Sequence, residues 1–506
     1  MVSKITSGAI LGVDGYTVTV ETDFTQGMPF FEIVGLPDSA VKESKERVRA
    51  AIKNANLQFP VKRITVNLAP ADTKKAGPSF DLPIALGILT CMGTIPRVGD
   101  VFVTGELSLN GDIRPVNGVL PMAHSAFKNG VKKAIVPYDN AEEASLVAGM
   151  EVVGAKSLAE LIVHFTKAKI PPFKSSLNEA FSSEDYRGLD FADVKGQDGV
   201  KRALEIAAAG YHNIIMIGPP GSGKTMIAQR LPSIMPGLTF NESMEITKIY
   251  SISGLLDNKK ALITQRPFRA PHHTASYISL TGGGMTPMPG EISLAHNGVL
   301  FLDELPEFQK KALETLRQPL EEGRVVIARA SGTQVYPSRF MLVAAMNPCP
   351  CGYNGTERCR CTNGEIAGYI NKISGPLLDR IDIQVEAPFV KYEQLHTERK
   401  PESSADIRKR VMAALAVQAE RYKSEDIRFN SMLSSSQVEK YCGLGNEERE
   451  IIKAAYNRLG MSARAYHKIL RVARTIADLD GAEDITTRHL AEAIGYRGLD
   501  RKYWQV

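Results

Sequence analysis

Apolar residues recur in the middle of the chain as short continuous runs that end in glycine, acidic or amide residues. Three such runs span residues 214–217, 298–302 and 340–346. Runs of this length are typical of strands buried on both faces of a parallel sheet. Residues 198–209, 226–231 and 313–322 favour helix. The pattern predicts a doubly wound α/β domain built on a parallel sheet.

The two ends of the chain show other periodicities. In the first third, strand patterns mix with two helical stretches, which predicts an α+β domain over 1–167. From residue 403 onward the pattern is helical with glycines between segments, which predicts a helical domain over 391–506. Residues 168–188, with paired prolines, serines and mixed charge, are typical of a linker and leave 189–390 as the central domain. Outside that domain we expect strands at 10–15, 16–22, 30–34, 64–68 and 101–103, and helices at 38–54, 81–92, 405–422, 434–441, 446–459, 462–480 and 486–494.

The run at 214–217 leads directly into Gly218-x-x-x-x-Gly223-Lys224-Thr225. Glycines let the backbone wrap a phosphate chain, with several N–H groups pointing at it from the positive end of the next helix. The lysine adds a mobile positive charge, and the threonine hydroxyl can bind Mg²⁺. A glycine-rich turn before an ordinary helix is the alternative; strand, loop and helix together favour binding of ATP with Mg²⁺. The predicted loop is Gly218, Pro219, Pro220, Gly221, Ser222, Gly223, Lys224 and Thr225.

Two adjacent carboxylates, Asp303 and Glu304, follow the run at 298–302. Side chains alternate along a strand, so we expect the two to point differently and to do different work. Asp303 would hold Mg²⁺ through its water shell, and Glu304 would orient and deprotonate an attacking water. The sequence therefore predicts ATP hydrolysis as well as ATP binding.

These motifs resemble those of AAA+ ATPases. In that family an amide at the end of a third strand helps to place the water, which assigns this role to Asn347; a simple capping residue before Pro348 is the alternative. The stretch Val194-Lys-Gly-Gln197 resembles the turn that touches the adenine base, which makes Gln197 a candidate nucleotide contact.

Two arginines are candidates for sensing the γ-phosphate. Gly375-Pro-Leu-Leu-Asp-Arg380 resembles the stretch of magnesium-chelatase motor subunits and MCM helicases whose arginine reaches the neighbouring subunit's ATP. A planar guanidinium suits charge spread over phosphoryl oxygens. A salt bridge from Arg380 to Asp379 or Asp382 is the alternative. Ser462-Ala-Arg464 resembles the lid motif whose arginine acts in the same subunit or in a neighbour. The resemblance implies a ring, and we expect a homo-hexamer in the presence of ATP.

Four cysteines lie within thirteen positions: Cys349, Cys351, Cys359 and Cys361. Two C-x-C pairs separated by a turn-rich loop can surround Zn²⁺ tetrahedrally, which predicts a structural zinc site in an insertion at 347–364. Disulfides or redox-sensing thiols are the alternatives. The other two cysteines, Cys91 and Cys442, stand alone and are expected to be buried thiols.

Two further segments of the central domain carry candidate chemistry. Residues 324–339 predict a hairpin with Arg324, Arg329 and Arg339, which resembles hairpins that grip DNA in the pore of ring helicases. Solvated arginines, or arginines that contact nucleotide, are the alternatives. Residues 282–290 predict a mobile loop. We expect a structural or interface role for His272 and His273, because adjacent side chains splay apart.

The first third resembles the Lon protease domain in Lys74-Lys-Ala-Gly-Pro-Ser79 and in residues 104–118. Ser79 occupies the position of the nucleophile, but the activating lysine's position falls near Leu120, and Lys128 lies about two helical turns beyond it. A serine without a base is a poor nucleophile. We therefore expect a Lon-like fold without proteolysis, with Ser79 capping a helix.

Composition narrows the function less than the motifs do. The 506 residues carry a net charge of +5, which is compatible with a local basic channel. The sequence contains no run of about eighteen apolar residues and no signal-peptide pattern, so we expect a cytoplasmic protein.

The motifs together resemble the magnesium chelatase-like YifB/ComM family. The resemblance implies a DNA motor, a helicase for branch migration of single-stranded or branched DNA in natural transformation. A chelatase motor subunit that remodels a protein partner is the first alternative, and an ATP-dependent serine protease is the second.

Overall fold

The computed structural model describes residues 2–174, 188–257, 261–284, 287–329, 332–390, 392–395 and 401–504. The chain divides into two compact units, each described here by itself. The first comprises Met1–Glu184, Phe240–Thr264 and Ala330–Val335, and the second Asp185–Thr239, Gln265–Arg329 and Tyr336–Val506. The predicted linker lies mostly outside the described residues, and the predicted domain boundaries stay predictions.

The first unit is built on a seven-stranded sheet of order β3-β4-β2-β1-β5-β8-β9. β1 and β2 form an antiparallel hairpin, as predicted, but its turn lies at residues 12 and 13 and not between residues 15 and 16. The β5, β8 and β9 edge is parallel. Aliphatic side chains of the sheet and of α1 and α2 form its core. The strands are β1 (Ser3–Leu11), β2 (Asp14–Thr25), β3 (Phe30–Val34), β4 (Arg63–Ala69), β5 (Val101–Val103), β8 (Lys133–Pro137) and β9 (Glu151–Ala155), with a small pair β6 (Glu106–Leu107) and β7 (Ile113–Arg114). The helices are α1 (Ser39–Asn54), α2 (Asp81–Met92), α3 (Val119–Lys128), α4 (Ala141–Ser145), α5 (Leu158–Thr166) and α9 (Phe240–Ile252).

The prediction that Ser79 caps a helix is wrong. Ser79 lies inside a short 3-10 turn, Pro78–Phe80, and α2 begins two residues later, at Asp81, without a side-chain cap. The buried Asp81 carboxylate instead accepts hydrogen bonds from the Arg47 guanidinium, at 2.6 and 3.0 Å, and from the backbone N–H of Leu107. An acid in the first turn suits the positive end of the helix, so the helix start is fixed by this pair.

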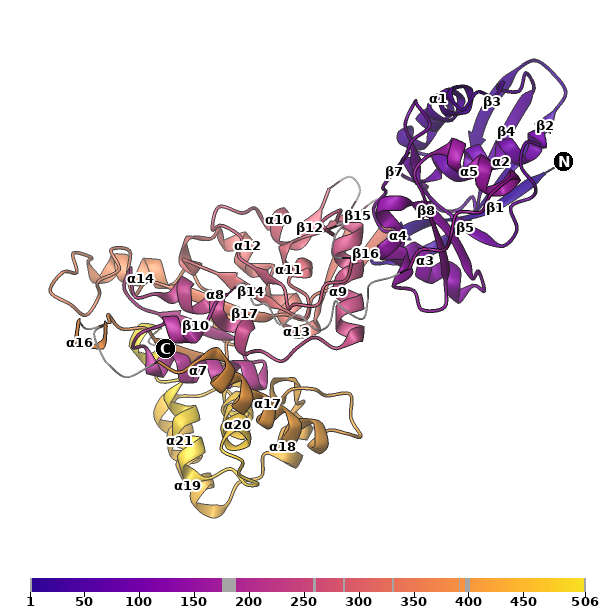
Figure 1. The fold of residues 1–506 in the computed structure, drawn as a ribbon. Helices are drawn as coiled ribbons and strands as arrows, with labels where there is room; N and C mark the ends of the chain where they lie inside the picture. The colour runs from indigo at the N-terminus through magenta and orange to yellow at the C-terminus, as the bar shows by residue number, and fades with distance from the viewer. Residues whose placement is uncertain are drawn as a thin grey trace. The chain divides into compact units, whose positions relative to one another are not determined.

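The second unit contains the predicted parallel sheet, in the order β11-β14-β17-β10-β18. Its strands are β10 (Ile214–Ile217), β11 (Phe268–Arg269), β14 (Val299–Leu302), β17 (Met341–Met346) and β18 (Ile383–Glu386). Every residue of β10, β14 and β17 is buried, which explains their continuous apolar runs. Helices α7 (Asp198–Gly210) and α8 (Lys224–Ile234) pack on this sheet (Figure 1). The predicted mixed α/β class with a parallel sheet is confirmed.

Short elements connect the sheet strands. The predicted helix at 313–322 is broken in two around Thr315 and Leu316. The predicted hairpin is present as β15 and β16, and part of the expected mobile loop at 282–290 forms a two-stranded ladder, with residues 285 and 286 outside the described part. These elements are α10 (Tyr277–Thr281), β12 (Gly282–Gly283), β13 (Met288–Pro289), α11 (Glu291–Leu294), α12 (Lys310–Glu314), α13 (Arg317–Glu322), β15 (Arg324–Arg329), β16 (Gly332–Pro337), α14 (Asn363–Ile370), α15 (Gly375–Leu378) and α16 (Tyr392–Leu395).

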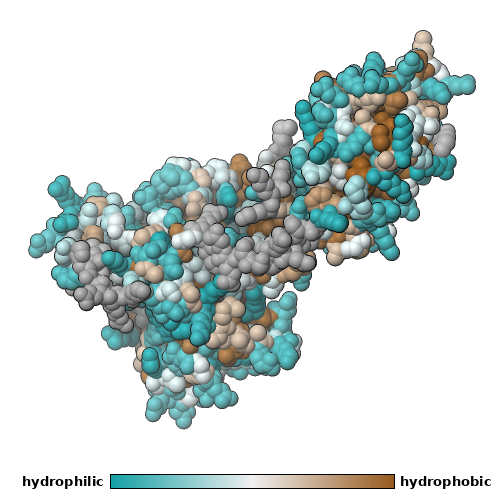
Figure 2. All heavy atoms as spheres, in the orientation of Figure 1, coloured by the Kyte–Doolittle hydropathy of each residue, from teal (hydrophilic) through white to brown (hydrophobic). Residues whose placement is uncertain are grey.

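The C-terminal helices belong to the second unit and share its core. α17 and α20 pack against α7, and the Gln418 amide donates to the carbonyl of Ala209 at 3.0 Å. Their visible face mixes hydrophilic and scattered hydrophobic residues (Figure 2). Across the described residues, the helices are all too short or too polar to cross a membrane. The helices are α17 (Ser404–Arg421), α18 (Ser435–Tyr441), α19 (Asn446–Leu459), α20 (Ala463–Leu479), α21 (Thr487–Gly495) and α22 (Leu499–Tyr503).

Candidate active site

The predicted nucleotide residues gather at the carboxyl-terminal ends of the strands of the parallel sheet. β10 and β14 each pair in parallel with β17, so the three strands end on the same side. The glycine loop follows β10, the two acids follow β14, and Asn347 follows β17. Carboxyl ends of parallel strands are where open α/β sheets bind ligands. The fold therefore brings together residues that are more than a hundred positions apart.

The glycine loop has a backbone that only glycine accommodates. Gly221 and Gly223 have φ values of 76° and 85°, in the left-handed region. At Gly218 a Cβ atom would lie 2.1 Å from the carbonyl oxygen of Ala387, so any side chain there would push the loop off the sheet. Gly223 is the residue immediately before α8, so the loop opens onto the helix N-terminus, where unpaired N–H groups favour anions.

Lys224 lies inside this loop. Its Nζ donates to the carbonyls of Gly218 and Pro219 at 2.7 and 3.0 Å, and lies 3.3 Å from Oδ1 of Asn347. Burial lowers the pKa of Lys224, while Asp303 and Glu304 act in the opposite direction. The ammonium is thus held by uncharged carbonyls, and a negatively charged phosphate oxygen would be a stronger partner for it.

Thr225 and Asp303 lie in direct contact, with 2.5 Å between the Thr225 hydroxyl oxygen and Oδ2 of Asp303. A hydroxyl and a carboxylate are the oxygen ligands that Mg²⁺ accepts, and the ion usually keeps waters in its remaining positions. These two side chains therefore fit the predicted Mg²⁺ site.

Asp303 and Glu304 diverge, but not for the reason expected from the sequence. The strand ends at Leu302, and Glu304 has a φ of 51°, so the two acids lie in a turn rather than on an alternating strand. The turn directs Asp303 to Thr225, while Oε2 of Glu304 lies 3.0 Å from Nδ1 of His273. His273 was expected to be structural or at an interface; the signal for this contact was its position soon after β11, the strand next to β14.

Gln197 supports the glycine loop from behind. It is buried, and its amide nitrogen donates to the carbonyls of Ser222 and Pro388 at 3.0 and 2.6 Å. These bonds tie the loop to the segment after β18. Its role as a contact of the adenine base stays a prediction.

Arg380 lies at the amino-terminal end of the strands, opposite the glycine loop. It precedes β18, which runs parallel to β10 and starts beside Ile214, whereas the glycine loop starts after Ile217. The guanidinium of Arg380 does not pair with Asp379 or Asp382; it contacts Glu321 of α13 and the carbonyl of Pro376.

Arg464 converges on the same acid. Arg464 lies at the start of α20, and its Nη1 is 3.6 Å from Oε1 of Glu321. The two arginines are thus neighbours, although 84 positions separate 380 from 464 in the sequence. Glu321 itself carries no sequence signal. Arg471 and Arg474 lie further along α20, where Arg474 pairs with Asp478 at 3.0 Å, as expected of an ion-pairing residue.

The four clustered cysteines meet in space. All four sulfurs lie within 4.8 Å of one another, and the sulfurs of Cys349, Cys351 and Cys359 are separated by 3.3, 3.8 and 3.9 Å. Tetrahedral Zn–S bonds of about 2.3 Å imply sulfur separations of about 3.8 Å. Backbone N–H groups of Arg360 and Tyr353 lower the pKa of Cys351 to about 6, which favours a thiolate there, whereas desolvation and the neighbouring sulfurs of Cys351 and Cys349 raise the pKa of Cys359 and Cys361. The cluster is compatible with zinc.

The cysteine insertion rests against the glycine loop. Gly352 has a φ of 83°, and a Cβ atom there would lie 2.4 Å from Cδ of Pro220. The insertion therefore lies beside the glycine loop. Of the lone cysteines, Cys442 is buried and Cys91 is half-buried.

Arg324 and Arg329 of the hairpin contact residues close to them in the sequence. Arg324 pairs with Glu322 at 3.0 Å, and Arg329 is exposed and donates to the carbonyl of Ala328. Contact of the hairpin with DNA stays a prediction.

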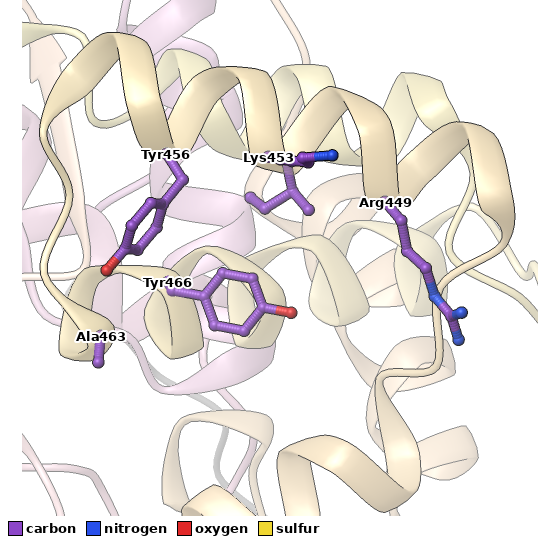
Figure 3. A pocket seen from close by; sticks show the side chains of 6 residues that line it. Arg449, Lys453, Tyr456, Ala463 and Tyr466 are labelled. Atoms are coloured by element: carbon purple, nitrogen blue, oxygen red, sulfur yellow. The ribbon is translucent and has the colours of Figure 1, made fainter.

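A separate hollow lies between α19 and α20, where Tyr456 and Tyr466 meet edge to face (Figure 3). Arg449, Ile452, Lys453 and Ala463 complete its lining. Its lining contains two cations but no acid that could hold Mg²⁺ or activate a water, so it lacks the groups that ATP hydrolysis requires.

Comparison with known proteins covers nearly the whole chain. Family models described as magnesium chelatase, subunit ChlI; subunit ChlI of Mg-chelatase; and magnesium chelatase, subunit ChlI C-terminal match residues 190–395, 20–140 and 401–497. The chain is 45% identical over 505 residues to competence protein ComM of Haemophilus influenzae, which covers 98% of this chain and 97% of that one. It is 42% identical over 504 residues to YifB of Escherichia coli, at 99% and 97% coverage. Lon protease 2 of Bacillus subtilis is 33% identical over 126 residues, 24% of this chain and 22% of the protease. The chain therefore belongs to the magnesium chelatase-like AAA+ family that includes ComM and YifB.

Proposed function

We propose that this protein is an ATP-hydrolysing AAA+ motor that works as a ring on DNA. The observation that carries the proposal is the separation of two half-sites. Lys224, Thr225 and Asp303 lie at the carboxyl-terminal ends of the parallel strands, and Arg380 lies at their amino-terminal ends. Neither half is sufficient for catalysis by itself.

At the first half-site, the chain's own groups bind and orient the triphosphate. The N–H groups of the glycine loop and the Lys224 ammonium bind phosphate oxygens. Thr225 and Asp303 hold Mg²⁺, which neutralises charge on the phosphates when bound. Glu304 accepts the proton of the attacking water, and Asn347 helps to place that water. Glu304 must leave His273 to do so.

The second half-site must come from another subunit. β18 has four residues, which at about 3.3 Å each span about 13 Å, so Arg380 of one chain is too far from its own glycine loop. Arg464 shares a carboxylate with Arg380 and lies on the same side. We therefore favour action of both arginines in a neighbour, with ATP at subunit interfaces of a homo-hexamer.

DNA as the substrate is supported by the similarity to competence protein ComM and by the exposed arginines of β15. We infer a branch-migration helicase that acts on single-stranded or branched DNA in the cytoplasm. A motor subunit that remodels a protein partner is the second candidate, because the matching family models are described by a magnesium chelatase subunit.

Two finer assignments accompany the proposal. Residues 1–167 form a Lon-like domain without proteolytic activity, because Leu120, near the position of the activating lysine, is buried in α3. The C-terminal helices form a lid over the nucleotide domain of the AAA+ module. The cysteine cluster holds a structural Zn²⁺ that stiffens the insertion beside the glycine loop.

The test is ATP hydrolysis by purified protein with no DNA, with forked DNA and with four-way DNA. We expect stimulation by branched DNA, displacement of a labelled strand, and loss of both in Arg380→Ala. Full hydrolysis by an Arg380→Ala monomer would refute the ring. A wild-type ATPase that ignores every DNA but responds to a protein fraction would favour the second candidate.

A further inference from the structure

Glu321 joins three segments of the second unit through one carboxylate. It lies near the end of α13, and its Oε1 contacts the guanidinium of Arg380 and lies 3.6 Å from Nη1 of Arg464. The Arg380 side chain is only 12% exposed, whereas those of Glu321 and Arg464 are 47% and 65% exposed. The carboxylate therefore lies between a half-buried arginine and a solvent-exposed one.

The contact decides where Arg380 points. Its remaining side-chain bond goes to the carbonyl of Pro376, and its buried Nε has no partner among the described residues. Without Glu321 the guanidinium would keep a single neutral acceptor. Two arginines this close also repel each other, and an interposed carboxylate removes one unit of that positive charge.

We propose that Glu321 is a positioning residue that presents Arg380 and Arg464 as one patch to the triphosphate of a neighbouring subunit. The inference rests on the proposed ring. Two guanidinium forks with one shared carboxylate keep a net positive charge, which suits the spread negative charge of a γ-phosphate. Because the shared carboxylate restricts both guanidinium groups before the neighbour arrives, less rotamer entropy is lost when the interface closes.

Glu322 offers a matched control on the same helix end. Its carboxylate pairs with Arg324 at 3.0 Å and accepts a hydrogen bond from Gln318. Glu322→Gln thus removes an ion pair of the same type without touching Arg380 or Arg464. Glu321→Gln removes the charge that we consider decisive, and Glu321→Asp keeps it on a shorter side chain.

The first experiment measures kcat and KM for ATP and the affinity of a fluorescent ATP analogue in the full-length variants. Misplaced catalytic groups cost about 10- to 100-fold in rate, so we expect kcat to fall by that factor in Glu321→Gln. We expect an intermediate kcat in Glu321→Asp and wild-type kcat in Glu322→Gln. Analogue affinity should stay within about twofold, because Glu321 lies far from its own glycine loop.

The second experiment tests action in a neighbour by mixing subunits. Lys224→Ala subunits lack the loop lysine but carry an intact Glu321 patch. Mixed with Glu321→Gln subunits, they should restore hydrolysis above the sum of the two separate rates. A simply misfolded Glu321→Gln protein would not be rescued in this way.

The outcomes separate this inference from the ring proposal. Wild-type kcat in both Glu321 variants, or no rescue by Lys224→Ala subunits, overturns the role of Glu321. If Arg380→Ala is inactive in the same assay, the ring proposal survives that result. If Arg380→Ala hydrolyses ATP normally as a monomer, both fail together.

Discussion

The buried carboxylate of Asp382 should be the main electrostatic connection between the sheet and the C-terminal helices. Its Oδ1 lies 2.9 Å from Nζ of Lys468, its Oδ2 lies 3.5 Å from Nδ1 of His212, and it also accepts the backbone N–H of Asn213 at 3.1 Å. Burial acts to raise the pKa of Asp382, but Lys468 and His212 prevail and hold that pKa well below its usual range. Asp382 follows Arg380 by two positions, and Lys468 follows Arg464 by four.

The perturbation is Asp382→Asn, which keeps the size of the side chain and removes its charge. Lys468 would remain with a 12% exposed side chain and no counter-charge. Breaking a buried ion pair from one side costs about 3–5 kcal/mol of unfolding free energy. In the double variant with Lys468→Met neither charge is left uncompensated, so its cost should fall short of the sum of the single costs by about 1–3 kcal/mol.

The assay is urea unfolding followed by the fluorescence of Trp504, the single tryptophan, which lies in the second unit. Asp379→Asn is the control, a half-buried acid three positions earlier. The stabilisation from Asp382 should be complete above about pH 4, the usual pKa of aspartate, and be lost as the pH falls further. A cost below about 1 kcal/mol for Asp382→Asn, or additive costs in the double variant, would refute the reasoning.

Three further variants test the active-site geometry. Glu304→Gln should bind ATP normally but lose about 10²- to 10⁴-fold in kcat, measured by phosphate release, and normal turnover would remove its role as the base. His273→Ala should raise DNA-independent hydrolysis by about 2- to 10-fold. His273 follows β11, which lies on the side of β14 away from β17 and β10, so its contact with Glu304 draws that carboxylate away from the glycine loop. His272→Ala should leave that rate unchanged, and a lower rate in His273→Ala would reverse the interpretation. Cys351→Ser should release one zinc per chain by elemental analysis while Cys91→Ser retains it; a wild type without zinc contradicts the site.

Local chemistry explains which predictions needed no structure. The glycine loop can be predicted from the sequence because its φ values and its contact with Ala387 exclude other residues at Gly218, Gly221 and Gly223. The parallel strands were readable because both of their faces are buried, which leaves continuous apolar runs. The clustering of the four cysteines can be predicted because they lie within thirteen positions of the chain. In each case the requirement is met within a few residues of the chain.

Predictions failed where a local rule met a tertiary contact. Ser79 had a capping side chain in a suitable position, but the Arg47–Asp81 pair fixed the helix start two residues later. Alternation was expected to separate Asp303 from Glu304, but the strand had already ended, and a left-handed turn separates them instead.

The sequence by itself determined the chemistry available to this protein: a glycine loop with a lysine, two acids after a buried strand, four thiols and two arginines, each carried by a short motif. Only the tertiary structure decided their grouping, with Asp303 beside Thr225 of the glycine loop, Glu304 beside His273, and the arginines beyond the far end of a four-residue strand. The physical reason is that strand order and chain direction set which ends meet, and these depend on packing between segments far apart in the chain. Glu321 and His273 gained their partners in the same way, through contacts that no local pattern encodes.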